Sequence, residues 1–333
     1  MQIEKIEQYL RGLPPALLDV ESIDSVDVFE MIPGSYNLNF HIKVNQRELI
    51  FRINIEPQSG LSQQVKYEFT VLKFLQNHRL APKAYHFDDN RQDFDFAILI
   101  EEYLKGPYLT LKNDDVSRAV DLLVRLHSLK PEGMTFVVSK DPLPDTFKLA
   151  RNDLIHYKSR KSARKKIIRL AHQLLTRSEA AVTKHRHLFE ADSLNHTDVG
   201  CDNFIKTAAG LKLIDWEKPR VDDCSYDIGC FLSEPVQKWC TQKVLNPEDR
   251  INFMIDYAHL SGKNSDFVIE KTNIREPLIS LHWVLWGATK LCDLEEHQTA
   301  TSLLESHEEK RARFERLADP ENLEKLLVAN SLY

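Results

Sequence analysis

The first hundred residues alternate between hydrophobic and polar positions as strands do. Residues 36–44 (YNLNFHIKV) place an apolar side chain at every second position, and residues 48–56 (ELIFRINIE) resume the alternation after a short polar turn. A period of two predicts half-buried strands, and two such strands joined by a short turn predict a hairpin. The segment 81–103 predicts two further strands around a second polar turn.

Elsewhere the spacing of apolar residues is helical. It changes to a period near 3.6 between residues 61 and 78, and again in most of the chain after Gly106. One later hairpin is predicted, with Gly210 in its turn. We therefore expect an α+β protein of two lobes: a β-rich N-terminal lobe over 1–104, with a five-stranded antiparallel sheet and a helix, and a mainly helical lobe over 105–333.

Composition narrows the class of protein. The 333 residues are 42% hydrophobic and 28% charged, with a net charge of −6, so general binding to nucleic acid or to an anionic membrane is disfavoured. The five cysteines form no CxxC pair, which favours reduced thiols. No apolar run reaches the roughly 18 residues that a membrane span needs. We expect a cytoplasmic protein.

The candidate catalytic and metal-binding side chains lie in two segments, LNHTDVGCDNF (194–204) and LKLIDWE (211–217). Asp198 precedes Asn203 by five positions, and Asp215 follows a short strand. Carboxylate and amide oxygens suit Mg²⁺, so Asn203 and Asp215 are candidate ligands. Asp198 is then the third carboxylate, placed to accept a proton. Phosphoryl transfer from ATP needs this combination of a metal and a base that orients the attacking hydroxyl.

The pattern His-x-Asp-x-x-x-x-Asn, followed by a strand that ends in Asp, resembles that of the aminoglycoside phosphotransferases and the choline/ethanolamine kinases. The resemblance extends from MIPGSYNLNF (31–40) to LHWVLWGATKL (281–291). It implies a protein-kinase-like fold, with ATP and magnesium as cofactors. It also implies that Asp198 is the catalytic base, that Asn203 and Asp215 are the metal ligands, and that His196 and Asp227 support the catalytic loop.

The same resemblance implies ATP-binding residues in the N-terminal lobe. PGSYNLNF places Gly34 and Ser35 in the hairpin that covers the phosphates, although this segment lacks the glycine-rich pattern of protein kinases. Arg52 stands where kinases keep a phosphate-binding lysine, and Glu68 would be its ion-pair partner. The backbone of Glu102 and Leu104 would hydrogen-bond adenine. The resemblance thus implies six ATP-binding residues: Gly34, Ser35, Arg52, Glu68, Glu102 and Leu104.

The acceptor is expected to be a small molecule with a hydroxyl group. Trp283 and Trp286 share one helical face, and indole rings bind organic cations, so an amine-bearing acceptor of the choline, ethanolamine or aminoglycoside kind is favoured. Glu217 is a further candidate for substrate binding, through its charge. Seven basic residues between 158 and 169 are typical of a solvated helix face, although they could also hold an anion.

Other activities stay open or are disfavoured. Protein kinases carry a lysine where Gly200 stands, and only twelve positions separate Asp215 from Asp227, too few for a regulated activation loop. The remaining alternatives are a kinase for a sugar or another neutral alcohol, and an ATP-binding protein of the same fold without turnover. Fold alone does not choose between them.

Overall fold

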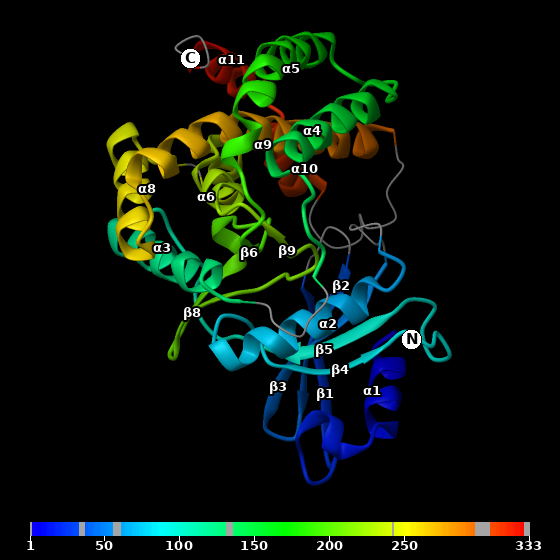
Figure 1. Cartoon of the computed structure of the whole chain (residues 1–333). Helices are drawn as coiled ribbons and strands as arrows, with labels where there is room; N and C mark the ends of the chain where they lie inside the picture. The colour runs from blue at the N-terminus through cyan, green and yellow to red at the C-terminus, as the bar shows by residue number, and fades with distance from the viewer. Residues whose placement is uncertain are drawn as a thin grey trace. The chain divides into compact units, whose positions relative to one another are not determined.

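The computed structural model describes residues 2–32, 37–55, 61–130, 136–241, 243–296 and 307–329. The chain divides into two compact units (Figure 1). Of the described residues, unit 1 comprises those within 1–107 and 205–218, and unit 2 comprises those within 108–204, 219–299 and 306–333. None of the helices within the described ranges is long and apolar enough to cross a membrane.

Unit 1 is built on a five-stranded antiparallel sheet. The strands lie in the order β1-β2-β3-β5-β4. Their bounds are β1 Val26–Ile32, β2 Asn37–Val44, β3 Arg47–Asn54, β4 Ala84–Asp88 and β5 Ile98–Glu102. The predicted hairpins 36–44/48–56 and 81–103 are therefore confirmed, and so is the helix predicted over 61–78, which forms α2 (Gln64–Leu75) and a short 3-10 turn (Gln76–His78).

The alternation along β3 gives the sheet two different faces. Phe51 and Ile53 join the apolar cluster that includes Ile6 and Leu10 of α1 (Gln2–Gly12). Arg52 lies between them in sequence and so points to the opposite face, where it meets α2. The second face thus receives a charged side chain in a buried position, which is unusual enough to mark a site.

Unit 2 is mainly helical, as predicted. Its helices are α3 Asn113–His127, α4 Pro142–Lys158, α5 Lys165–His185, α6 Ser225–Leu232, α7 Glu234–Cys240, α8 Pro247–Ser261, α9 Ser265–Glu295, α10 His307–Leu317 and α11 Pro320–Ala329. The long α9 contacts α4, α6, α8 and α10 (Figure 1), and its buried side chains join the main apolar core of the unit.

Two expectations about local structure are wrong. Besides the predicted hairpin β7–β8 (Phe204–Thr207 and Gly210–Leu213), the chain forms two short strands, β6 (Ser193–Asn195) and β9 (Arg220–Asp222), which pair antiparallel. Three residues are too few to show a period. The basic stretch 158–169 is also not one helix face, because α4 ends at Lys158 and α5 begins at Lys165.

Candidate active site

The segment that follows β6 is a loop whose backbone is held by one buried carboxylate. Asp227, on α6, is fully buried and accepts hydrogen bonds from the backbone N–H groups of His196 and Thr197, both at 2.8 Å. Thr197 has a φ of 72°, a left-handed conformation that a β-branched residue rarely adopts. Such strain persists only where its surroundings enforce it, and Asp227 supplies that constraint.

Asp227 is itself held by a second histidine. Nε2 of His127, at the end of α3, lies 3.2 Å from Asp227, and its Nδ1 lies 2.8 Å from the hydroxyl of Tyr257. Burial would raise the pKa of Asp227, but the hydrogen bonds from His127 and from the backbone hold that pKa below its usual range. The carboxylate therefore stays ionised while buried.

Asp227 and His127 thus form a clamp on the loop after β6, and this loop carries side chains predicted for catalysis. His196 is buried, and its Nδ1 accepts the backbone N–H of Asp198 at 3.2 Å. Asp198 and Asn203 are only half-buried. Nδ2 of Asn203 donates to the carbonyl of Asp198 at 2.8 Å, which turns the amide so that its oxygen is the atom available to a cation.

Asp215 belongs to unit 1, where it follows the end of β8. The backbone N–H of Leu213 donates to the carbonyl of Leu80 at 2.8 Å, and the indole of the buried Trp216 donates to the carbonyl of Leu213 at 2.8 Å. These bonds anchor the turn on both sides of Asp215, whose φ is 66°. Its side chain is 37% exposed, so a carboxylate oxygen remains open to a ligand.

Arg52 is surrounded by carboxylates. Its guanidinium lies 2.6 Å from Glu68, 3.2 Å from Glu101, 3.4 Å from Asp215 and 3.7 Å from Glu217. Burial would lower the pKa of Arg52, but these carboxylates raise it. Burial raises the pKa of Glu68 to about 8 and that of Glu217 well above its usual value, because one guanidinium does not offset the whole cluster.

Glu217 lies within this cluster. Besides Arg52, it accepts hydrogen bonds from the amides of Asn37, at the start of β2, and Gln64, at the start of α2. The two tryptophans with which the sequence grouped it are in unit 2. Trp283 is 8% exposed, and Trp286 packs edge-to-face against Trp283 and Trp239.

The structure says less about the other residues that the sequence predicts to bind ATP. Gly34 and Ser35 lie outside the described residues. The N–H of Glu102 donates to the carbonyl of Lys83 at 2.8 Å, and its carboxylate accepts from Lys212 at 3.0 Å. Leu104 follows β5 in a segment that is neither helix nor strand.

Sequence reasoning missed two participants, Glu101 and His127, and a sequence signal existed only for Glu101. Glu101 lies two positions after Leu99, the residue opposite Arg52 in the β3–β5 register, so strand alternation puts Glu101 on the same face as Arg52. His127 closes the amphipathic helix α3, but nothing local to it points to Asp227, which is 100 positions away. Such a pairing depends on the tertiary fold.

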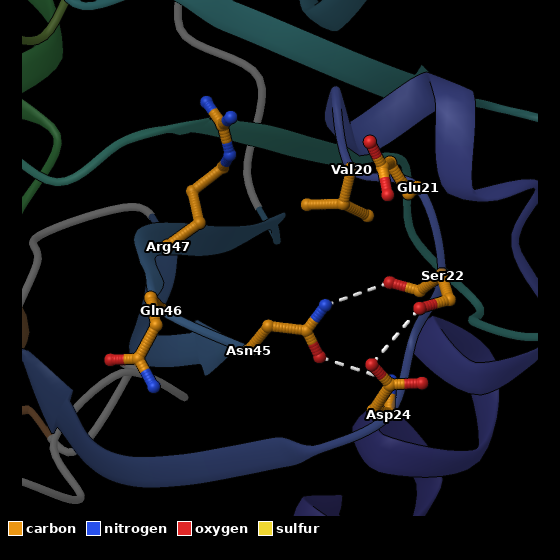
Figure 2. Close-up of a pocket in the computed structure, with 7 residues that line it drawn as sticks. All are labelled: Val20, Glu21, Ser22, Asp24, Asn45, Gln46 and Arg47. Atoms are coloured by element: carbon orange, nitrogen blue, oxygen red, sulfur yellow. Dashed lines mark hydrogen bonds between the residues drawn. The ribbon is translucent and has the colours of Figure 1, made fainter.

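Unit 1 also contains a depression near the turn between β2 and β3. It is lined by side chains from the segment before β1 and from the β2–β3 turn (Figure 2). Oδ1 of Asn45 accepts the backbone N–H groups of Asp24 and Ser25, and its Nδ2 donates to the carbonyl of Ser22. These bonds hold a turn in which Asn45 has a φ of 54°. None of the residues predicted for catalysis lines the depression.

The antiparallel sheet with its buried Arg52–Glu68 pair, and the helical unit with its clamped Asp198 loop, define a kinase-like phosphotransferase. A model of the Phosphotransferase enzyme family matches residues 30–260. The chain belongs to this family and is accordingly a phosphotransferase enzyme. The predicted family and the predicted α+β two-lobed fold class are confirmed. A search of curated protein sequences finds no match.

Solved structures share the fold at low sequence identity. Choline kinase from Cryptosporidium parvum Iowa II is 18% identical, with a TM-score of 0.65 and 98% of each chain covered. Plasmodium vivax ethanolamine kinase is 16% identical, with a TM-score of 0.63 and coverage of 93% of this chain and 83% of the other. A spectinomycin phosphotransferase, solved with ADP and spectinomycin, is 13% identical, with a TM-score of 0.63 and coverage of 100% and 99%.

Proposed function

We propose that the chain transfers the γ-phosphoryl group of ATP to a hydroxyl of a small molecule, with Asp198 as the base. The observation that supports this most is the clamped loop: Asp227 holds His196 and Thr197, and the amide of Asn203 is tied to the carbonyl of Asp198. A half-buried carboxylate on a loop fixed in this way can orient an acceptor hydroxyl and accept its proton.

Asn203 and Asp215 are the proposed magnesium ligands. In sequence they stand on either side of the β7–β8 hairpin, and both offer oxygen atoms: an amide oxygen oriented by the Nδ2 bond, and a carboxylate that is 37% exposed. This donor set fits Mg²⁺, which takes one or two carboxylate or carbonyl ligands and completes its shell with phosphate oxygens and water. When bound, the ion supplies positive charge to the phosphates.

Arg52 is the proposed phosphate contact within unit 1. Its Nε is buried and makes no hydrogen bond within the described part of the chain, while its two other nitrogens lie near carboxylates. An arginine N–H that is held in place but unpaired is suited to a phosphate oxygen. Gly34, Ser35, Glu102 and Leu104 complete the proposed nucleotide site, with the hairpin over the phosphates and the chain after β5 against adenine.

The acceptor is proposed as a small alcohol. The resemblance to choline, ethanolamine and aminoglycoside kinases favours an amine-bearing one. The packing of Trp283 and Trp286 against other aromatic rings favours the alternative, a sugar or another neutral alcohol.

The test of this proposal is ADP release from ATP and Mg²⁺ over a panel of cationic, neutral and anionic alcohols, with acceptor-free reactions as the control. Acceptor-dependent ADP release is the expected result. ATP binding without turnover on any class of alcohol would support the non-catalytic alternative instead.

A further inference from the structure

A carboxylate and an indole ring meet beside the catalytic loop of unit 2. Asp202 directly precedes the proposed metal ligand Asn203 in sequence. Its Oδ2 accepts hydrogen bonds from the indole N–H of Trp239 at 3.0 Å and from the guanidinium of Arg313 at 2.9 Å. Its Oδ1 accepts from the thiol of Cys240 at 3.0 Å.

The face of the indole is occupied by the same guanidinium. The central carbon of Arg313 lies 4.2 Å from the ring centroid of Trp239, well inside the roughly 6 Å within which cation–π attraction operates. An indole face next to a carboxylate is the chemistry that recognises an organic cation. Here the cation is a side chain of the enzyme, supplied by α10.

Packing holds Arg313 in this position. Its neighbour Phe314 is 1% exposed and contacts the rings of both Trp239 and Trp286. Three residues further on, Leu317 is also 1% exposed and approaches Gly287 of α9 so closely that a Cβ there would lie 2.7 Å from its side chain. The helix that carries the guanidinium is therefore anchored by two buried side chains, Phe314 and Leu317, that follow Arg313 along α10.

We infer that Arg313 is a specificity-determining residue that fills an organic-cation subsite beside the catalytic loop. With Arg313 in place, an acceptor ammonium group finds the Trp239 face covered and the Asp202 charge already paired. The acceptors of the enzyme are therefore neutral or anionic alcohols. This conclusion about acceptors rests on the proposed kinase function, whereas the presence of a filled cation subsite does not.

The test is a calorimetric titration with tetramethylammonium chloride in the absence of nucleotide. The wild type should bind this probe weakly, and Arg313→Ala should bind it at least tenfold more tightly, because both the indole face and the carboxylate become available. Arg313→Lys keeps a cation at the site and should behave as the wild type does. The double variant Arg313→Ala/Trp239→Leu should lose this gain in affinity for tetramethylammonium.

The matched control is Arg311→Ala, on the same helix, which removes an equal charge. Arg311 pairs with Glu295 and Glu315 and does not contact Trp239 in the described structure. If Arg313→Ala does not fold, as judged by circular dichroism, Arg313→Gln takes its place. The inference would be overturned if the wild type bound tetramethylammonium tightly, or if the folded Arg313 variant showed no gain in affinity. An equal gain in affinity in Arg311→Ala would also overturn it. A lack of turnover on all alcohols would count against the kinase function alone.

Discussion

At the scale of single residues, the Asp227 cluster of unit 2 and the Arg52 cluster of unit 1 are held by buried charges in opposite ways. Asp227 lies among donors, namely two backbone N–H groups and His127, so its pKa is lowered. Glu68 is buried and shares one guanidinium with Glu101, Asp215 and Glu217, so its pKa is raised, chiefly by burial. The first arrangement stabilises a loop, and the second favours the protonated form of Glu68 beside Arg52.

Replacing Asp227 tests the clamp. Asp227→Ala leaves three buried donors without their acceptor and releases the strained backbone of Thr197, so we expect the free energy of unfolding to fall by about 3–5 kcal/mol. Asp227→Asn keeps one acceptor oxygen and should lose less. The measurement is urea denaturation at neutral pH. Equal losses in the two variants, or a loss in Asp227→Ala no larger than that of a surface mutation, would contradict the role given to this carboxylate.

The raised pKa of Glu68 makes stability depend on pH. Its pKa rises from 4.5 to about 8 on folding, so the folded state holds a proton that the unfolded state has lost. The stabilisation is fully present below about pH 4.5 and is lost as the pH rises towards 8, with a slope of at most about 1.4 kcal/mol per pH unit. Glu68→Gln should make the free energy of unfolding fall less steeply with rising pH.

Thermal unfolding of the protein without nucleotide between pH 5 and 8 measures this effect. Glu179→Gln, on an exposed position of α5, is the control and should retain the wild-type slope. A wild-type melting temperature that rises over this pH range, or one that Glu68→Gln leaves unchanged at each pH, would show that Glu68 is ionised in the folded protein.

At the scale of elements, the sequence predicted what depends on local periodicity. The hairpin of β2 and β3, the helix α2 and the hairpin around Gly210 all follow from the spacing of apolar side chains. The strands β6 and β9 were missed because three residues show no period, and the break between α4 and α5 was missed because basic residues suit a helix face and a loop equally. Their placement depends on tertiary contacts.

The residues of the candidate site also fall into those that local sequence predicts and those that depend on tertiary contacts. Asp198, Asn203 and Asp215 could be selected because their order and spacing are local features of the chain. The ring of carboxylates around Arg52, the support of Asp227 by His127 and the contact of Arg313 with Trp239 join distant segments. No local pattern encodes such contacts, and only the folded chain reveals them.

The contact between α9 and α10 is a prediction at this scale. A methyl group at Gly287 would lie 2.7–3.0 Å from the side chain of Leu317, so Gly287→Ala should lower the free energy of unfolding by about 1–3 kcal/mol through overpacking. Gly12→Ala is the control, because nothing lies within 4 Å of its added methyl group and it ends α1. Chemical denaturation that gives both variants the same stability would argue against close packing of these helices.

At the scale of the whole molecule, the proposed chemistry draws on residues far apart in the sequence, from Arg52 to Asp227. The metal provides a test that does not depend on the acceptor. Wild-type affinity for ATP should rise with Mg²⁺, and Asp215→Ala should lose that dependence, because the carboxylate that holds the ion is gone. Titration calorimetry at several Mg²⁺ concentrations measures this. Equal ATP affinity of the wild type with and without Mg²⁺ would contradict the proposed ligands.

The most direct test of the central claim compares catalysis and ATP binding in a single variant, Asp198→Asn. Removal of a positioned base should lower kcat by about 10²–10⁴-fold with the best acceptor of the panel. The amide preserves the size of the side chain, and Asp198 is not a proposed metal ligand, so ATP should bind with unchanged affinity. A variant that retains the wild-type kcat would show that Asp198 is not the base.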